Sequence, residues 1–168
     1  MPYYADTQLS PHFNLLVGVD SGAVIFCHTY DSRDECRQIL DLERKFFPDL
    51  SEDKAALNPI ITRLNHYFSG GDTDPAGMDV RFSRGTAFER KIWSTLREIK
   101  KGDTISYQQL GEKAGFPRSQ RAVGGAMGRN YLLLFVPCHR VISKTNGLGG
   151  FSAGIKKKEF LLKLEDIF

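Results

Sequence analysis

The residues with the clearest chemical potential in this sequence are the neighbours Cys138 and His139, which follow an apolar run and a proline. A thiolate is a strong nucleophile, and a nearby histidine can take the thiol proton. The run Leu132–Val136 has the length and apolar character of a strand buried on both faces. Because Pro137 cannot donate a backbone hydrogen bond, the strand should end there and present Cys138 at its tip. A buried, inert cysteine is the alternative that this stretch leaves open.

The second half of the chain carries a large positive charge, which bears on the kind of partner it binds. Residues 81–168 hold 17 Lys and Arg against 7 Asp and Glu, a net charge of +10. Residues 1–80 hold 6 Lys and Arg against 13 Asp and Glu, a net charge of −7. A basic unit joined to an acidic one favours a polyanionic partner for the basic unit. An ordinary solvated basic surface is the alternative.

Composition and cysteine use predict an intracellular protein that is not in a membrane. No apolar stretch approaches the length that crosses a bilayer, and the N-terminus lacks the basic and apolar regions of a signal peptide. Cys27, Cys36 and Cys138 are odd in number and irregularly spaced, so we expect free thiols in a reducing compartment. That compartment is the cytoplasm or, in a eukaryote, the nucleus. Cys27 and His28 lack further ligands at zinc spacing, so no metal site is expected.

The first half of the chain has the patterns of a small unit of strands and helices. Two apolar runs within Phe13–Tyr30, separated by a turn with glycine, predict a β-hairpin. Helical periodicity predicts two helices, over 34–47 and 59–71. Residues 70–79 are rich in Gly, Asp and Pro without periodicity. We therefore expect an N-terminal domain over 1–78, with its linker from about residue 70.

The second half, which we expect to form a domain over 79–168, has the periodicity of three helices. These cover residues 86–102, 104–115 and 116–130. The last two are joined by a tight turn and predict a helix-turn-helix. Small residues dominate 122–128, although each glycine in a helix costs about 1 kcal/mol. So little bulk suits close approach, either by another helix or by a narrow DNA groove with Arg118, Arg121 and Arg129 around it.

Taken together, these segments resemble the O6-alkylguanine-DNA alkyltransferases, also called methylated-DNA–protein-cysteine methyltransferases. The resemblance is carried by RAVGGAM at 121–127 and PCHRVI at 137–142, with TAFERKIW, ISYQQLGEKAG, GGFSAG and KKEFLLKLE around them. It covers the second half continuously and extends weakly to LNHYFSG at 64–70. The resemblance implies an α+β fold. A small antiparallel N-terminal sheet with helices would precede a mostly helical, winged-helix-like helix-turn-helix domain.

The same resemblance implies DNA repair by direct, irreversible and stoichiometric transfer of the alkyl group from O6-alkylguanine to Cys138. His139 matches the base, and Glu165 matches the carboxylate that orients the histidine. Asn130 matches a buried asparagine that ties the helix-turn-helix to the active-site loop. Because adjacent side chains of an extended chain point apart, His139 should reach Cys138 through a water or a turned backbone. A thioether is a poor leaving group, so the protein would act once.

The partner that the resemblance implies is double-stranded DNA containing O6-alkylguanine, bound through the minor groove by a monomer without a cofactor. Tyr107 and Arg121 match the pair that extrudes the damaged nucleotide, which is base flipping. Gln108 is expected to contact DNA beside them. The pocket around the guanine is matched by Val141, Phe151 and Ser152.

Three positions depart from the family pattern. Tyr131 follows Asn130 where proline is common, Leu133 stands where some members carry a pocket proline, and Phe151 replaces a common tyrosine. These departures bear on the rate and on the tolerance of bulky alkyl groups, not on the nucleophile. The structural zinc of some members has no matching ligand set in this sequence.

Three other functions compete with this prediction. A non-catalytic sensor of alkylated guanine would lack the cysteine, so Cys138 argues against it. A helix-turn-helix regulator that reads the major groove needs long polar side chains on its recognition helix, and residues 122–128 offer few. A cysteine hydrolase has no use for a basic half and a Gly-rich helix.

Overall fold

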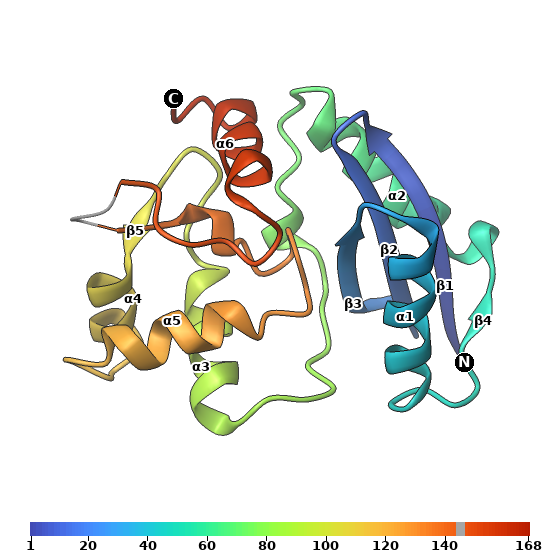
Figure 1. Ribbon diagram of the computed structural model, residues 1–168, viewed down its shortest axis with the longest axis horizontal. Helices are drawn as coiled ribbons and strands as arrows, with labels where there is room; N and C mark the ends of the chain where they lie inside the picture. The colour runs from blue at the N-terminus through green and yellow to red at the C-terminus, as the bar shows by residue number, and fades with distance from the viewer. Residues whose placement is uncertain (144–146) are drawn as a thin grey trace. The chain divides into compact units, whose positions relative to one another are not determined.

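A four-stranded sheet dominates the first part of the chain in the computed structural model, which describes residues 1–143 and 147–168 (Figure 1). Its strands, in the order β3-β2-β1-β4, are β1 (Pro2–Ser10), β2 (Phe13–Asp20), β3 (Ala23–Tyr30) and β4 (Ser51–Glu52). The first three pair antiparallel, whereas β4 runs parallel to β1. Ser21 and Gly22 join β2 to β3 with φ of 53° and 84°, the positive values that a two-residue hairpin turn needs. The predicted hairpin is therefore confirmed.

Two helices pack on this sheet, α1 (Arg33–Arg44) near β3 and α2 (Lys54–Phe68) near β1 and β2. Each begins where a side chain accepts a hydrogen bond from a free backbone N–H group, Ser32 for α1 and Asp53 for α2. The predicted start of the second helix at residue 59 is wrong. Because Asp53 caps the helix, Pro59 lies inside it rather than at its first turn.

The chain forms two compact units, and the main boundary between them follows Ser83. Residues 70–79 contain the short 3-10 helix η1 (Pro75–Gly77). Val24 in β3 then donates to the Asp79 carbonyl at 2.9 Å and accepts from the backbone N–H of Arg81 at 2.9 Å. These bonds hold the segment after η1 to the sheet. Unit 1 comprises Met1–Ser83 with Tyr131–Leu133, and unit 2 comprises Arg84–Asn130 with Leu134–Phe168.

Unit 2 is mainly helical and contains the predicted helix-turn-helix. Its elements are α3 (Ala87–Leu96), β5 (Ile105–Ser106), α4 (Tyr107–Lys113), α5 (Gln120–Gly128), η2 (Cys138–Arg140), β6 (Val141–Ile142) and α6 (Ile155–Leu164). Strand β5 pairs parallel with β6. Helices α3, α4 and α5 pack on one another (Figure 1). The core between them includes the fully buried Leu110, Val123 and Ala126. The sheet of unit 1 and the helices of unit 2 together confirm the predicted α+β fold.

Two boundaries in unit 2 differ from the prediction. Helix α3 ends at Leu96, because the backbone N–H groups of Glu98 and Ile99 bond to the carbonyls three residues earlier and tighten the chain into turns. Residues 105–106 form a strand, and Ser106 then caps α4. Within residues 1–143 and 147–168, no helix has the length and apolar character needed to cross a membrane.

The predicted strand over Leu132–Val136 is wrong, although all five residues are buried as expected. Cys27 of β3 bonds to the Tyr131 carbonyl and to the Leu133 N–H at 2.8 and 2.9 Å, and regular pairing then ends. Leu134 has a left-handed backbone with φ of 72°, which turns the chain. A turn of this kind in an apolar run has no signature in the sequence, because leucine rarely adopts it.

Candidate active site

Cys138 is the first residue of η2, a single helical turn that begins after Pro137. Its side chain is buried, with 4% of the residue exposed. The backbone N–H of Cys138 donates to the Val136 carbonyl at 2.8 Å, and that of Arg140 donates to the Pro137 carbonyl at 2.9 Å. The thiol is therefore held by a tight backbone turn and not by the end of a strand. His139 follows on this turned backbone. A turned backbone was one of the two ways, besides a bridging water, in which the sequence allowed His139 to reach Cys138.

The side chain of Asn130 ties the end of α5 to this turn. Its Nδ2 donates to the Val136 carbonyl at 2.9 Å and to Cys138 Sγ at 3.2 Å. The backbone N–H of Asn130 donates to the Met127 carbonyl at 3.2 Å, which fixes the residue against the last turn of the helix. One amide group thus links the helix-turn-helix to the sulfur atom, in the position that the resemblance implied.

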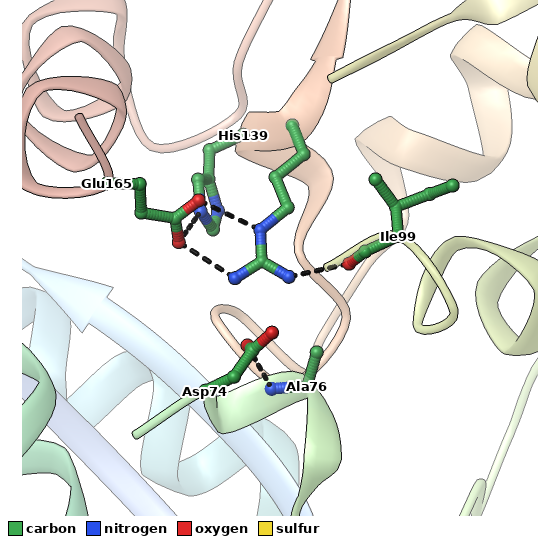
Figure 2. Close-up of polar contacts among 6 residues, drawn as sticks. Asp74, Ala76, Ile99, His139 and Glu165 are labelled. Atoms are coloured by element: carbon green, nitrogen blue, oxygen red, sulfur yellow. Dashed lines mark hydrogen bonds and ion pairs between the residues drawn. The ribbon is translucent and has the colours of Figure 1, made fainter. Parts of the chain in front are cut away.

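His139 and Glu165 meet in the interior of unit 2, with 1% and 2% of each residue exposed. His139 Nε2 lies 2.9 Å from Glu165 Oε1 (Figure 2). An ionised carboxylate only accepts hydrogen bonds, so the proton between them belongs to Nε2. In the neutral ring, Nδ1 is then the nitrogen that can take up a proton. This is the geometry expected of a carboxylate that orients a basic histidine.

Arg140 completes the network, and sequence reasoning gave it no role. It is fully buried, and its Nε and Nη2 donate to the two Glu165 oxygens at 2.9 and 2.8 Å. Its Nη1 donates to the Ile99 carbonyl at 2.7 Å. Burial alone would raise the pKa of Glu165, but the hydrogen bonds from His139 and Arg140 outweigh it and hold that pKa well below its usual range. Glu165 therefore stays charged, and its position relative to η2 is fixed by three hydrogen bonds.

Lys158 is a second buried cation that sequence reasoning did not single out. Its Nζ donates to the carbonyls of Val141, Leu148 and Gly150 at 2.6, 2.5 and 3.2 Å. It is fully buried, and burial lowers the pKa of Lys158 to about 8. Lys158, Leu161, Leu162 and Glu165 follow the spacing of one helix face, which could have indicated an inward lysine.

The surroundings of Cys138 act on its acidity in opposite directions. Burial raises the pKa of the Cys138 thiol above its ordinary value, and the hydrogen bond from Asn130 and the positive charge of Lys158 offset only part of that rise. The thiol therefore holds its proton at neutral pH and needs a base to become a nucleophilic thiolate. Asn130 and Lys158 are the two groups that stabilise this thiolate once it forms.

A pocket of about 150 Å³ opens onto Cys138. Its walls are Tyr107 of α4, Met127 and the small Gly124 and Gly128 of α5, and the segment Gly150–Ser152. Phe151 and Ser152, which the resemblance assigned to the guanine pocket, thus line one cavity with the sulfur, and Tyr107, which it assigned to nucleotide extrusion, lines the same cavity. Burial raises the pKa of Tyr107, so its hydroxyl keeps its proton at neutral pH.

The other expected residues lie elsewhere. Val141 is buried and forms no part of the described wall of this pocket; its carbonyl binds Lys158 instead. Gln108 and Arg121 have exposed side chains on α4 and α5, and Gln108 Nε2 donates to Glu112 at 2.8 Å. In the part of the chain that the structure describes, no three His, Cys, Asp or Glu side chains gather closely enough to hold a metal ion.

Comparison with known proteins places this site in a family. Residues 87–167 match the family model described as 6-O-methylguanine DNA methyltransferase, DNA binding domain. The chain is 38% identical over 134 residues to a methylated-DNA–protein-cysteine methyltransferase of Shigella flexneri, covering 76% of this chain and 74% of that protein. A protein of the same name from Kluyveromyces lactis is 38% identical over 115 residues, and the match spans 68% of this chain and 61% of that protein.

The fold has a solved counterpart as well. The crystal structure of Mycobacterium tuberculosis OGT in complex with DNA superposes with a TM-score of 0.80 at 29% sequence identity. The alignment covers 98% of this chain and 93% of that one, so the similarity extends over both compact units.

Proposed function

Since this chain belongs to the family of methylated-DNA–protein-cysteine methyltransferases, we propose that it repairs DNA by moving the alkyl group of O6-alkylguanine irreversibly to Cys138. The observation that carries this assignment is the pocket that opens onto a buried cysteine held by Asn130. A buried nucleophile that lines a pocket, followed in the chain by a histidine that pairs with a carboxylate, suits a substrate that must be brought out of the DNA duplex.

The reaction balances with the groups of this site. Cys138 loses its proton to His139, whose protonated ring is stabilised by the charged Glu165. The thiolate attacks the alkyl carbon, an S–C bond forms, and the C–O6 bond breaks with its electron pair left on the guanine. The guanine takes the proton back from the histidine. Cys138 ends as a thioether. Because the thiolate is a poor leaving group, the alkyl group stays on the sulfur, and one protein repairs one lesion.

We assign the DNA contacts to the helix-turn-helix of unit 2. Tyr107 and Arg121 would extrude the nucleotide from the minor-groove side, with Gln108 beside them, and Phe151 and Ser152 would hold the flipped base. The exposed Arg121 and the pocket position of Tyr107 support this division of roles. In this proposal residues 79–168 carry DNA binding and alkyl acceptance, residues 1–78 form a separate domain, and the protein acts as a monomer inside the cell, where the DNA is.

A single-turnover assay tests the proposal directly. The protein is incubated with an excess of duplex DNA that carries one O6-methylguanine per duplex, and it is then digested and the masses of its peptides are measured. We expect one methyl group per protein, on the Cys138 peptide, and none on the Cys138→Ala variant. Cys36→Ala is the matched control and should react like the wild type, because Cys36 lies in unit 1 and burial raises its pKa.

Two outcomes would contradict the proposal. Binding of the lesion with no gain of mass would make the protein a damage sensor. Equal binding of damaged and undamaged duplexes, again with no gain of mass, would leave a helix-turn-helix protein with another purpose.

A further inference from the structure

We propose that Glu89 and Arg129 form a clamp that positions Asn130 and, through it, Cys138. Both are positioning residues in this proposal, because neither touches the pocket. The inference rests on the function proposed above and adds residues that control how well the thiol is presented. It also gives Arg129 a role other than the DNA contact that its charge suggested.

Glu89 is a fixed anchor at the start of α3. It belongs to a capping box, in which its Oε2 accepts from the backbone N–H of Thr86 at 2.7 Å and its own N–H donates to Thr86 Oγ1 at 3.2 Å. Only 6% of the residue is exposed. The hydrogen bonds from Thr86 and Arg129 lower the pKa of Glu89, so the carboxylate is charged at neutral pH.

Arg129 lies at the C-terminal end of α5 and pairs with this carboxylate through its Nε. Its guanidinium rests on Gly125, where an added Cβ would lie 3.2 Å from Nη2 and 3.3 Å from Nη1. The backbone N–H of Arg129 donates to the Gly125 carbonyl at 3.2 Å. Because Gly125, one turn before Arg129, has no side chain, the guanidinium can lie close to the helix backbone.

A second bond joins the same two helices nearby. Trp93 Nε1 of α3 donates to the Ala126 carbonyl of α5 at 2.9 Å, and both residues are buried. The end of α5 is thus held at a core contact and at an ion pair. Asn130 follows Arg129 directly, so the ion pair acts on the residue whose amide binds Cys138 Sγ. Loosening it should let Asn130 move and weaken the bond that stabilises the thiolate.

The test measures the alkylation rate of Cys138 in three variants: Arg129→Met, Glu89→Gln and the double substitution. Glutamine can still accept from the Thr86 N–H, so Glu89→Gln keeps the capping box and removes the charge. Each variant reacts with the free base O6-benzylguanine, with duplex DNA containing O6-methylguanine, and with iodoacetamide at several pH values. Methylation, benzylation and carbamidomethylation are followed as mass on the Cys138 peptide.

We expect each single variant to lower the rate about fivefold with both the free base and the duplex, since one weakened hydrogen bond is worth that factor. The iodoacetamide profile should shift to higher pH. The double variant should be no slower than the single ones, because both remove the same link. Arg129→Lys should recover part of the rate. Arg37→Met, which removes an arginine from the exposed pair with Asp34 in unit 1, should change nothing.

Other results would overturn the clamp. If Arg129→Met slows only the duplex reaction and Glu89→Gln reacts normally, then Arg129 is a DNA contact. If neither variant shifts the iodoacetamide profile, Asn130 does not depend on the pair. If the wild type leaves alkylguanine intact, the proposed function fails, yet the iodoacetamide profile still decides on the clamp. Should Arg129→Met not fold, the isosteric Glu89→Gln carries the test.

Discussion

Replacing Glu165 by glutamine would remove the negative charge from the buried ionic network of His139, Arg140 and Glu165. The carboxylate accepts hydrogen bonds from His139 at 2.9 Å and from Arg140 at 2.9 and 2.8 Å. Glutamine has the same shape but only one oxygen, and its NH2 group would face a donor. Arg140 would then stay buried with the Ile99 carbonyl and a neutral amide as its described partners.

The size of the effect follows from this arrangement. Removing one member of a buried ion pair costs about 3–5 kcal/mol, because the other charge is left uncompensated. The free energy of unfolding of a domain is about 5–15 kcal/mol, so a large part of it is at stake. With a urea m-value of about 2 kcal/mol/M, the midpoint should fall by about 2 M.

A urea titration followed by tryptophan fluorescence measures this loss of unfolding free energy in unit 2, which contains Glu165. Trp93 is the single tryptophan, and it is buried in unit 2. Glu98→Gln is the matched control, because Glu98 pairs with Lys113 at 3.1 Å on the surface, where an ion pair is worth less than about 1 kcal/mol. A loss of less than about 1 kcal/mol in Glu165→Gln would refute the reasoning. It would mean that Arg140 gains other partners when the carboxylate is neutralised.

The pH dependence gives an independent check. The pKa of Glu165 is lower in the folded protein than its usual value of about 4.3, so the charged form stabilises the fold. This contribution is fully present above pH of about 4.3 and is lost as the pH falls further. The wild type should therefore lose stability in acid more steeply than Glu165→Gln. If the stability of the two proteins fell equally with decreasing pH, Glu165 would not carry the stabilising charge.

Three further predictions concern single side chains. Asn130→Ala should raise the apparent pKa of Cys138 and lower its rate with iodoacetamide at pH 8 about fivefold, the worth of one hydrogen bond; an unchanged pH profile would count against this. Lys158→Met should fall behind the wild type in stability as the pH rises above about 8, because the unfolded lysine still binds its proton there; urea midpoints at pH 8 and 10 measure the gap. Arg121→Ala should weaken duplex binding and reduce its salt slope by about 1, while the iodoacetamide rate of Cys138 stays the same.

Much of the architecture was predictable because it depends on local patterns. The hairpin of β2 and β3 follows from two apolar runs around a glycine, and α4 and α5 follow from helical periodicity and a short turn. Strand β1 was not predicted. It pairs with β2 on one side and with the short β4 on the other, and most of its side chains are only half-buried, so its sequence has little apolar alternation.

The site was predictable only in part, for a physical reason. The apolar run and the adjacency of Cys138 and His139 point to the nucleophile and its neighbour within one short segment, whereas Glu165 follows only from the family resemblance. Arg140 was missed because its partners, the Glu165 carboxylate and the Ile99 carbonyl, are distant in sequence. The spacing of α6 indicates that Lys158 faces inward, but the carbonyls that bind its Nζ cannot be read from residue types. The left-handed Leu134 is likewise fixed by the packing around it and not by its own preference.

The hydrogen bond between His139 and Glu165 closes a long loop of the chain. Asn130, Cys138 and His139 are close neighbours in the chain, whereas Glu165 lies 26 residues after the histidine. Closing a loop of that length costs about 3 kcal/mol of chain entropy. The bond from Asn130 to the Cys138 sulfur spans only eight positions and costs less chain entropy. The orientation of the base therefore rests on a long-range contact with the end of α6, and that of the thiol on a local one.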